Sequence, residues 1–195
     1  MAIDTSTIKQ LREQTGVGVA DVKSALEEAQ GDTQKALEIL RVKSAVKASK
    51  KASREATEGL VASYIHTNGK VGVLVDVSSE TDFVARNDEF KQLVNDIAMH
   101  IAAADPLYVK AEDVPAEVLT KEKEIIAEQL KEDGKTDEMI AKIMPGKIDK
   151  YYEEVCLLNQ PFIKDDSMTI AQLIEQKIGA LGEKIEVRRF ARFQK

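Results

Sequence analysis

Residues 60–77, LVASYIHTNGKVGVLVDV, are the stretch of sequence that decides the fold. On both sides of Asn68-Gly69 the pattern has a period of two, which is typical of β-strands. The Asn-Gly pair predicts a two-residue type I′ hairpin turn, because both central residues of that turn need a positive φ. A lone hairpin needs a packing partner. The sequence supplies one in a predicted helix that follows the candidate N-cap Asn87, with apolar residues at helical spacing: Phe90, Leu93, Val94, Ile97, Ala98 and Ile101.

The rest of the chain extends this hairpin into an α+β domain, which we predict over residues 59–195. A strand-like segment at 185–193 would add a third strand to a small antiparallel sheet with helices on one side. Between them, residues 115–158 predict a helical hairpin. Its second helix is expected to be interrupted at Pro145-Gly146, because proline removes a backbone donor and clashes with the preceding turn.

The N-terminal residues, 1–45, predict a separate domain of three short helices. Glycines at 16 and 31 mark the ends of the first two helices, and Asp32 can cap the third. We interpret residues 46–58 as a basic linker, since the stretch from 41 to 54 has six Lys and Arg residues and no acid. A solvated linker and a contact for RNA or an acidic partner both fit this charge run.

Composition excludes several classes of protein. The chain has 195 residues, of which 43% are hydrophobic and 32% charged, so it can bury a core. Its net charge of −6 argues against a duplex-DNA binder, which needs clustered cations. The sequence contains neither an apolar run of about 18 residues nor a signal-peptide core. We therefore expect a soluble, cytoplasmic protein without a membrane partner.

The same sequence offers little for catalysis. His66 and His100 are far apart, and Cys156 is the single cysteine, so no metal-binding pattern is present. The two Gly-Lys pairs lack the earlier glycine and the following Ser or Thr of a phosphate-binding loop. We predict no metal, no cofactor and no bond-making chemistry.

The most unusual segment is 79–86, SETDFVAR, between the hairpin and the long helix. Thr81 can cap a short helical turn, and Asp82 would then meet free N–H groups at its start. Phe83 has two interpretations. It is either a hydrophobic staple onto the core or an exposed functional side chain.

Five sequence blocks together resemble bacterial translation elongation factor Ts over nearly the whole chain. The N-terminal block, LREQTGVG with the later DVKSAL, resembles the family's small ubiquitin-associated-like domain. HTNGKVGVLVDV resembles its core hairpin, and TDFVARNDEF is the family's most specific signature. The later blocks are LNQPF and the terminal RFARF.

This resemblance implies a guanine nucleotide exchange factor for elongation factor Tu. It assigns the segment Thr81, Asp82, Phe83 and Val84 to displacing Mg²⁺ from the GDP-bound partner, so that GDP leaves and GTP can bind. It also assigns docking of the N-terminal domain to the end of the first helix, at Leu11 and Arg12. Leu11 could equally belong to the core of its own small domain.

The length of the chain resembles the short form of the family, in which two copies can pair, so a homodimer is possible. The alternative function is an RNA- or protein-binding adaptor that uses the basic linker. We expect no direct contact with nucleic acid if the exchange-factor interpretation holds.

Overall fold

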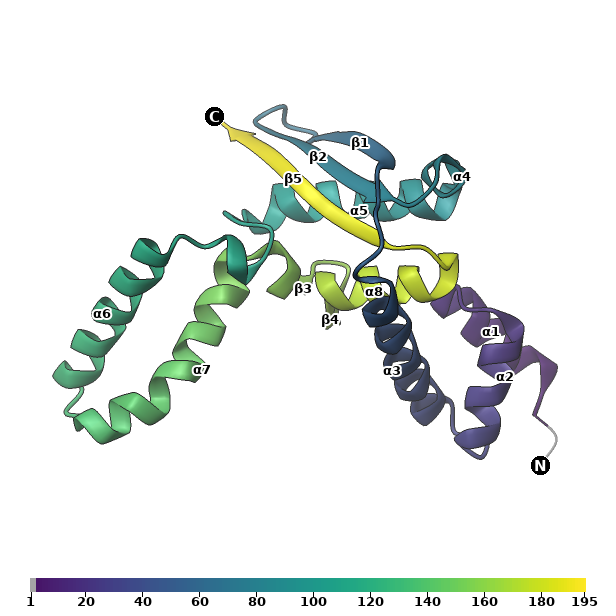
Figure 1. Cartoon of the computed structure of the whole chain (residues 1–195), viewed down its shortest axis with the longest axis horizontal. Coiled ribbons are helices and arrows are strands. Elements are labelled where there is room, and N and C mark those ends of the chain that lie inside the picture. The colour runs from purple at the N-terminus through teal and green to yellow at the C-terminus, as the bar shows by residue number, and fades with distance from the viewer. Residues whose placement is uncertain (1–2) are drawn as a thin grey trace. The chain divides into compact units, whose positions relative to one another are not determined.

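The structure is a computed structural model that describes residues 3–195. The chain divides into two compact units, one formed by residues up to 102 together with 171–195, and the other by residues 103–170 (Figure 1). Both contain helices; the first also has a three-stranded antiparallel sheet, and the second has a two-stranded one. The α+β class predicted from the sequence is confirmed.

Three helices open the first unit: α1 (Thr5–Thr15), α2 (Val19–Glu28) and α3 (Thr33–Lys51). The Asp4 carboxylate caps α1, and the Asp32 carboxylate caps α3 by accepting from the backbone N–H groups of Gln34 and Lys35. The helices enclose a small apolar core: Leu11, Val17, Val22, Ala25, Leu26, Ala29, Ala36 and Leu40. The predicted three-helix arrangement is therefore correct. Its likeness to a ubiquitin-associated domain stays a prediction.

The predicted basic linker begins inside α3, which continues to Lys51. Two lysines of the basic stretch 41–54 form ion pairs with α2: Lys43 Nζ lies 3.0 Å from Glu28, and Lys47 Nζ lies 2.8 Å from Asp21. These acids, more than ten residues earlier in the chain, compensate a charge run that contains none of its own.

Helix α3 also contacts α8 (Ile170–Leu181) closely. Ser44 is buried, and a Cβ placed on Gly179 would lie only 2.5 Å from the Ser44 Oγ atom. Gln176 of α8 donates a hydrogen bond to the carbonyl oxygen of Thr15 at 3.3 Å. A glycine is therefore required at position 179 for the two helices to approach as they do.

The sheet has the order β1–β2–β5, with β1 (Glu58–Ile65), β2 (Val71–Ser79) and β5 (Ile185–Gln194) all antiparallel to their neighbours. The predicted hairpin is confirmed, but its type I′ turn is wrong. Only Gly69 has a positive φ in the loop, +68°. The Asn68 side chain accepts from the Lys70 N–H at 2.9 Å, which closes the loop locally without a left-handed conformation at Asn68.

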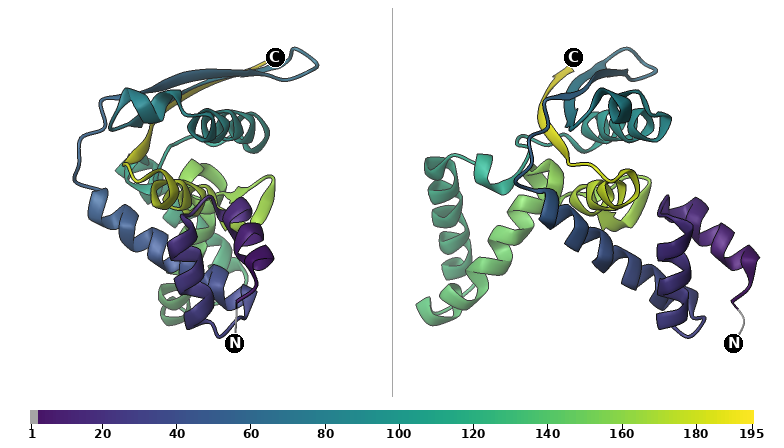
Figure 2. Two further views of the ribbon diagram at one scale, coloured as in Figure 1. Left: turned by 90° about the vertical axis from the view of Figure 1, so that its right-hand side faces the viewer. Right: turned by 45° about the vertical axis from the view of Figure 1, so that its right-hand side comes forward.

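One face of the sheet is covered by α5 (Asp88–Ala104), as Figure 2 shows with the sheet seen edge-on. Val73, Val75 and Val77 of β2 are buried on this side. Arg192, the register partner of Val73 on β5, donates to the Ala102 carbonyl oxygen of α5 at 3.2 Å. The predicted covering helix is confirmed. Asn87 precedes it and accepts from the Glu89 N–H at 2.7 Å.

The second unit contains η1 (Ala111–Asp113), α6 (Ala116–Glu132), α7 (Asp137–Val155), η2 (Leu157–Asn159), β3 (Pro161–Phe162) and β4 (Asp165–Thr169). Helices α6 and α7 form the predicted helical hairpin. The predicted interruption at Pro145 is wrong, because α7 continues through it. Ile140 and Ile148, on either side of the proline, belong to one apolar cluster with Ile126 and Leu130 of α6. This shared packing offsets the one hydrogen bond that proline removes.

Candidate functional site

The segment singled out in the sequence forms a short turn and helix between β2 and α5. Helix α4 spans Asp82–Arg86, with Thr81 as its N-cap in an extended conformation. The Thr81 hydroxyl accepts from the Val84 N–H at 3.4 Å, as the sequence predicts for a capping threonine. We call residues 81–84 the TDFV turn.

The side chain of Phe83 projects from this turn into solvent, with 82% of its surface exposed. Helix α4 contains no buried residue. Phe90, the first aromatic residue of α5, is by contrast completely buried. The interpretation of Phe83 as a staple onto the core is therefore wrong, and a large apolar side chain is left for another use.

Asp82 lies beside Phe83 and is also accessible. Its carboxylate is 3.0 Å from the guanidinium of Arg86, one helical turn later, and both side chains are substantially exposed. An exposed pair of this kind contributes about 0.3–0.5 kcal/mol. The turn thus presents an apolar ring and a weakly held carboxylate together.

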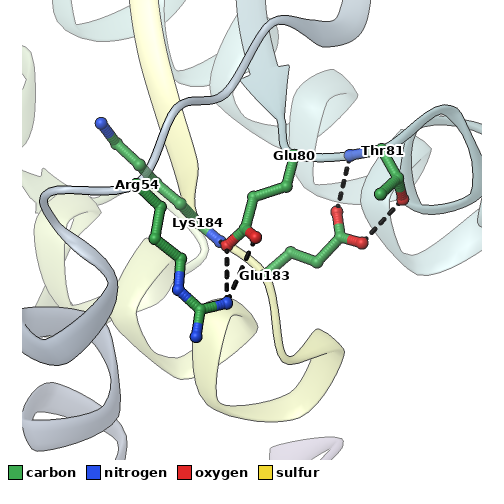
Figure 3. Close-up of polar contacts among 5 residues, drawn as sticks. All are labelled: Arg54, Glu80, Thr81, Glu183 and Lys184. Atoms are coloured by element: carbon green, nitrogen blue, oxygen red, sulfur yellow. Dashed lines mark hydrogen bonds and ion pairs between the residues drawn. The ribbon is translucent and has the colours of Figure 1, made fainter.

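Two glutamates to which the sequence analysis assigned no role anchor the turn (Figure 3). The Glu183 carboxylate, in the loop between α8 and β5, accepts from the Thr81 N–H at 3.0 Å and from the Thr81 hydroxyl at 2.6 Å. Glu80 extends the other way and accepts from the Lys184 backbone N–H at 2.6 Å. Residues 81 and 183 are 102 positions apart, so no local pattern could have joined them.

Glu80 has a second partner in Arg54, whose guanidinium lies 3.2 Å from its carboxylate. The Lys184 N–H and, after it, Arg54 hold the pKa of Glu80 below its usual value. The predicted linker therefore contributes one cation directly beside the TDFV turn.

The two docking residues predicted in the N-terminal helices differ in their accessibility. Leu11 is only 3% exposed and lies in the three-helix core, whereas Arg12 is exposed. Arg12 also lies in the last turn of α1, where its carbonyl oxygen accepts from the Gly16 N–H at 2.8 Å. Of the two, Arg12 presents its side chain to solvent.

A second exposed apolar surface lies on the sheet face opposite α5. Four large apolar side chains of this face are exposed, and three of them line a shallow hollow near the hairpin loop. The four are Val61, Ile65, Leu74 and Phe193, and we call them the outer sheet face.

The residues that could hold a metal or cofactor do not come together. Within residues 3–195, no three His, Cys, Asp or Glu side chains form a group suited to a metal ion. Cys156 is buried, and that burial raises the pKa of its thiol to about 11. The thiol is therefore protonated near neutral pH. In the described part of the chain, we find no helix both long and apolar enough to span a membrane.

Comparison with known proteins agrees with these features. The family model described as elongation factor TS matches residues 2–195. The chain belongs to the elongation factor Ts family. It is 54% identical to elongation factor Ts of Fervidobacterium nodosum, covering 100% of this chain and 98% of that protein. The corresponding protein of Thermosipho melanesiensis is 52% identical, over 98% of this chain and 97% of the relative.

A longer relative, elongation factor Ts of Carboxydothermus hydrogenoformans, is 53% identical over 98% of this chain and 88% of its own length. Membership in the elongation factor Ts family implies a nucleotide exchange factor for elongation factor Tu in translation elongation. The resemblance found in the sequence is confirmed at the level of the family.

Proposed function

We propose that this protein binds GDP-bound elongation factor Tu and inserts the TDFV turn beside the nucleotide, which dislodges Mg²⁺ and promotes GDP release. GTP then binds to the empty site, and the cycle takes place in the cytoplasm during translation elongation. The observation that carries this proposal is the exposure of Phe83 on an anchored turn, next to the accessible carboxylate of Asp82.

The energetic requirement is differential binding. An exchange factor must bind the nucleotide-free GTPase more tightly than the nucleotide-bound one, because equal affinity for both shifts no equilibrium. By reciprocity, a nucleotide that enters the GTPase weakens the factor's own binding. No covalent bond is made or broken in this cycle.

Each residue of the turn has a physical role in this proposal. Phe83 enters an apolar pocket of the partner, where burying its ring is worth about 1.5–3 kcal/mol. Asp82 brings a negative charge toward the ion and its ligands, and so perturbs the contacts that hold Mg²⁺. Thr81 fixes the start of the turn, and Val84 adds apolar contact at its end.

The N-terminal helices provide a second contact in the proposal, through the end of α1. Arg12 supplies the exposed cation, and Leu11 supports it from within the three-helix core. This division of roles is more specific than the sequence-based assignment of both residues to docking.

A homodimer is the second partner that we propose, through the outer sheet face. An apolar patch on a sheet is suited to packing against an equivalent sheet, since two apolar faces exclude water together. The expected result is a dimer by sedimentation equilibrium that Leu74→Glu converts to a monomer. A wild-type monomer at micromolar concentration would contradict it.

The alternative function, an RNA- or protein-binding adaptor, depends on the cations of the basic stretch 41–54. The ion pairs of Lys43 and Lys47 with acids of α2 reduce the charge available to RNA. Any RNA affinity should therefore be weak and should fall steeply with salt.

The deciding experiment is release of fluorescent GDP from elongation factor Tu with catalytic amounts of this protein. We expect Phe83→Ala to lower kcat/KM about 10- to 100-fold, equivalent to the ring's burial, and Asp82→Ala to lower it as well. Leu107→Ala is the matched control, because Leu107 is also an exposed large apolar residue. Wild-type rates in both turn variants would contradict the proposal.

A further inference from the structure

The anchoring of the TDFV turn is reciprocal between two loops that are distant in sequence. A glutamate from each loop accepts a backbone N–H of the other: Glu183 from Thr81 at 3.0 Å, and Glu80 from Lys184 at 2.6 Å. Figure 3 shows the two carboxylates side by side, reaching in opposite directions. The Thr81 hydroxyl donates a third hydrogen bond, 2.6 Å long, to Glu183.

We propose that Glu183 is a positioning residue for nucleotide exchange, which holds the TDFV turn in the conformation that presents Phe83. This inference rests on the proposed function of the turn. It assigns a role to a residue of the α8–β5 loop, outside the signature segment itself.

The turn needs an external anchor because it has little packing of its own. Helix α4 has five residues and none of them is fully buried, so its contacts with β1 and β2 fix its orientation only weakly. Thr81 supplies a polar fixed point, because Glu183 accepts hydrogen bonds from both its N–H and its hydroxyl. Hydrogen bonds to a charged acceptor are stronger than those between neutral groups.

The Thr81 hydroxyl also couples the anchor to the helix. It donates to Glu183 and accepts from the Val84 N–H at 3.4 Å. Loss of the Glu183 carboxylate would free the hydroxyl to rotate and would release the Thr81 N–H to water. The partner would then have to order the turn on binding, at an entropic cost that a preorganised turn avoids.

The test compares Glu183→Ala with Glu186→Ala in the GDP-release assay. Glu186 is the matched control, because it is a nearby carboxylate on β5 that pairs with Lys184 Nζ at 3.0 Å. We expect Glu183→Ala to lower kcat/KM about tenfold, and the control to remain near the wild-type value. Glu183→Gln keeps one acceptor oxygen and should be intermediate.

Two further measurements separate positioning from a general structural role. Amide hydrogen exchange of residues 81–84 should accelerate in Glu183→Ala, while that of α5 should not change. In addition, Phe83→Ala should cost less activity in the Glu183→Ala background than in the wild type, since both changes act through one element. The proposal would be overturned if the activity losses of the two substitutions multiply in the double variant. It would also be overturned if the amides of residues 81–84 exchange no faster in Glu183→Ala than in the wild type.

Failure of the underlying function gives a different result. Full activity of Phe83→Ala would refute the role of the turn itself. A slow Phe83→Ala beside a fully active Glu183→Ala would refute only the positioning role.

Discussion

Helices α4 and α5 are neighbours in the chain, yet their aromatic residues lie in opposite environments. Phe83 in α4 is 82% exposed, whereas Phe90, seven residues later in α5, is fully buried against the core. Seven residues amount to about two helical turns, so in one continuous helix the two rings would lie on the same side. The break at Asn87, which is extended, places them in different environments.

This difference indicates that the stability of the domain and its proposed function depend on different residues. α5 contributes eight buried residues, and α4 contributes none. The energy that holds the domain together therefore comes from α5 and the sheet, while the TDFV turn is held at one end by polar bonds. Residues of the turn are free to serve a partner without supporting the core.

The largest effect should come from Phe90→Ala. Removing a fully buried Phe ring is expected to lower the free energy of unfolding by about 3–5 kcal/mol. Phe83→Ala should change it by no more than about 0.5 kcal/mol, as for other surface substitutions. Urea denaturation followed by circular dichroism measures both. Equal destabilisation by the two variants would remove the contrast and return Phe83 to the core.

An intermediate loss of stability is expected from a substitution that tests the close approach of α3 and α8. Gly179→Ala would place a Cβ 2.5 Å from Ser44 Oγ, so one helix must shift. Overpacking of this kind typically costs about 1–3 kcal/mol. Ser44→Gly in the same chain should restore part of the loss.

Gly146→Ala is the matched control for this substitution. Gly146 lies in α7 with no atom within 4 Å of an added Cβ. In a helix interior, Gly→Ala stabilises by about 0.5–1 kcal/mol. Thermal unfolding should thus move in opposite directions for the two variants. A stabilised Gly179→Ala would show that α3 and α8 are not packed tightly at this point.

Local patterns predicted much of this fold. The alternation across 60–77, the apolar spacing after Asn87 and the cap at Asp32 each describe one segment, and each element formed where it was expected. The exceptions depend on contacts between segments. Pro145 is tolerated because Ile140 and Ile148 share one apolar cluster with residues of α6. The sequence of α7 alone does not predict this contact.

The candidate site shows the same limit. Thr81 was predicted as a cap because its role is local, and the signature identified its neighbours. Glu183 lies in an ordinary polar loop, and its importance depends on a bond between residues 102 positions apart. The exposure of the Phe83 side chain decided between its two interpretations. Its position in the sequence permits a hydrophobic staple but does not require one.

The smallest effect concerns the pH dependence of the anchor at Glu80. Its pKa in the folded protein is lowered from the usual value of 4.5, first by the Lys184 N–H and then by Arg54. A carboxylate with a depressed folded pKa stabilises the protein above the unfolded pKa and loses that contribution as pH falls through the folded value. Glu80→Gln should therefore be less stable than the wild type by about 0.5–1 kcal/mol at pH 6, and the gap should close at a pH below 4.5.

Arg54→Ala should keep part of this pH dependence, because the Lys184 N–H remains, and 0.5 M salt should weaken only the Arg54 contribution. Denaturant titrations between pH 3 and 6 measure all three proteins. Parallel stability profiles for wild type and Glu80→Gln would mean that Glu80 does not anchor the turn, which would leave Glu183 as its support from the α8–β5 loop.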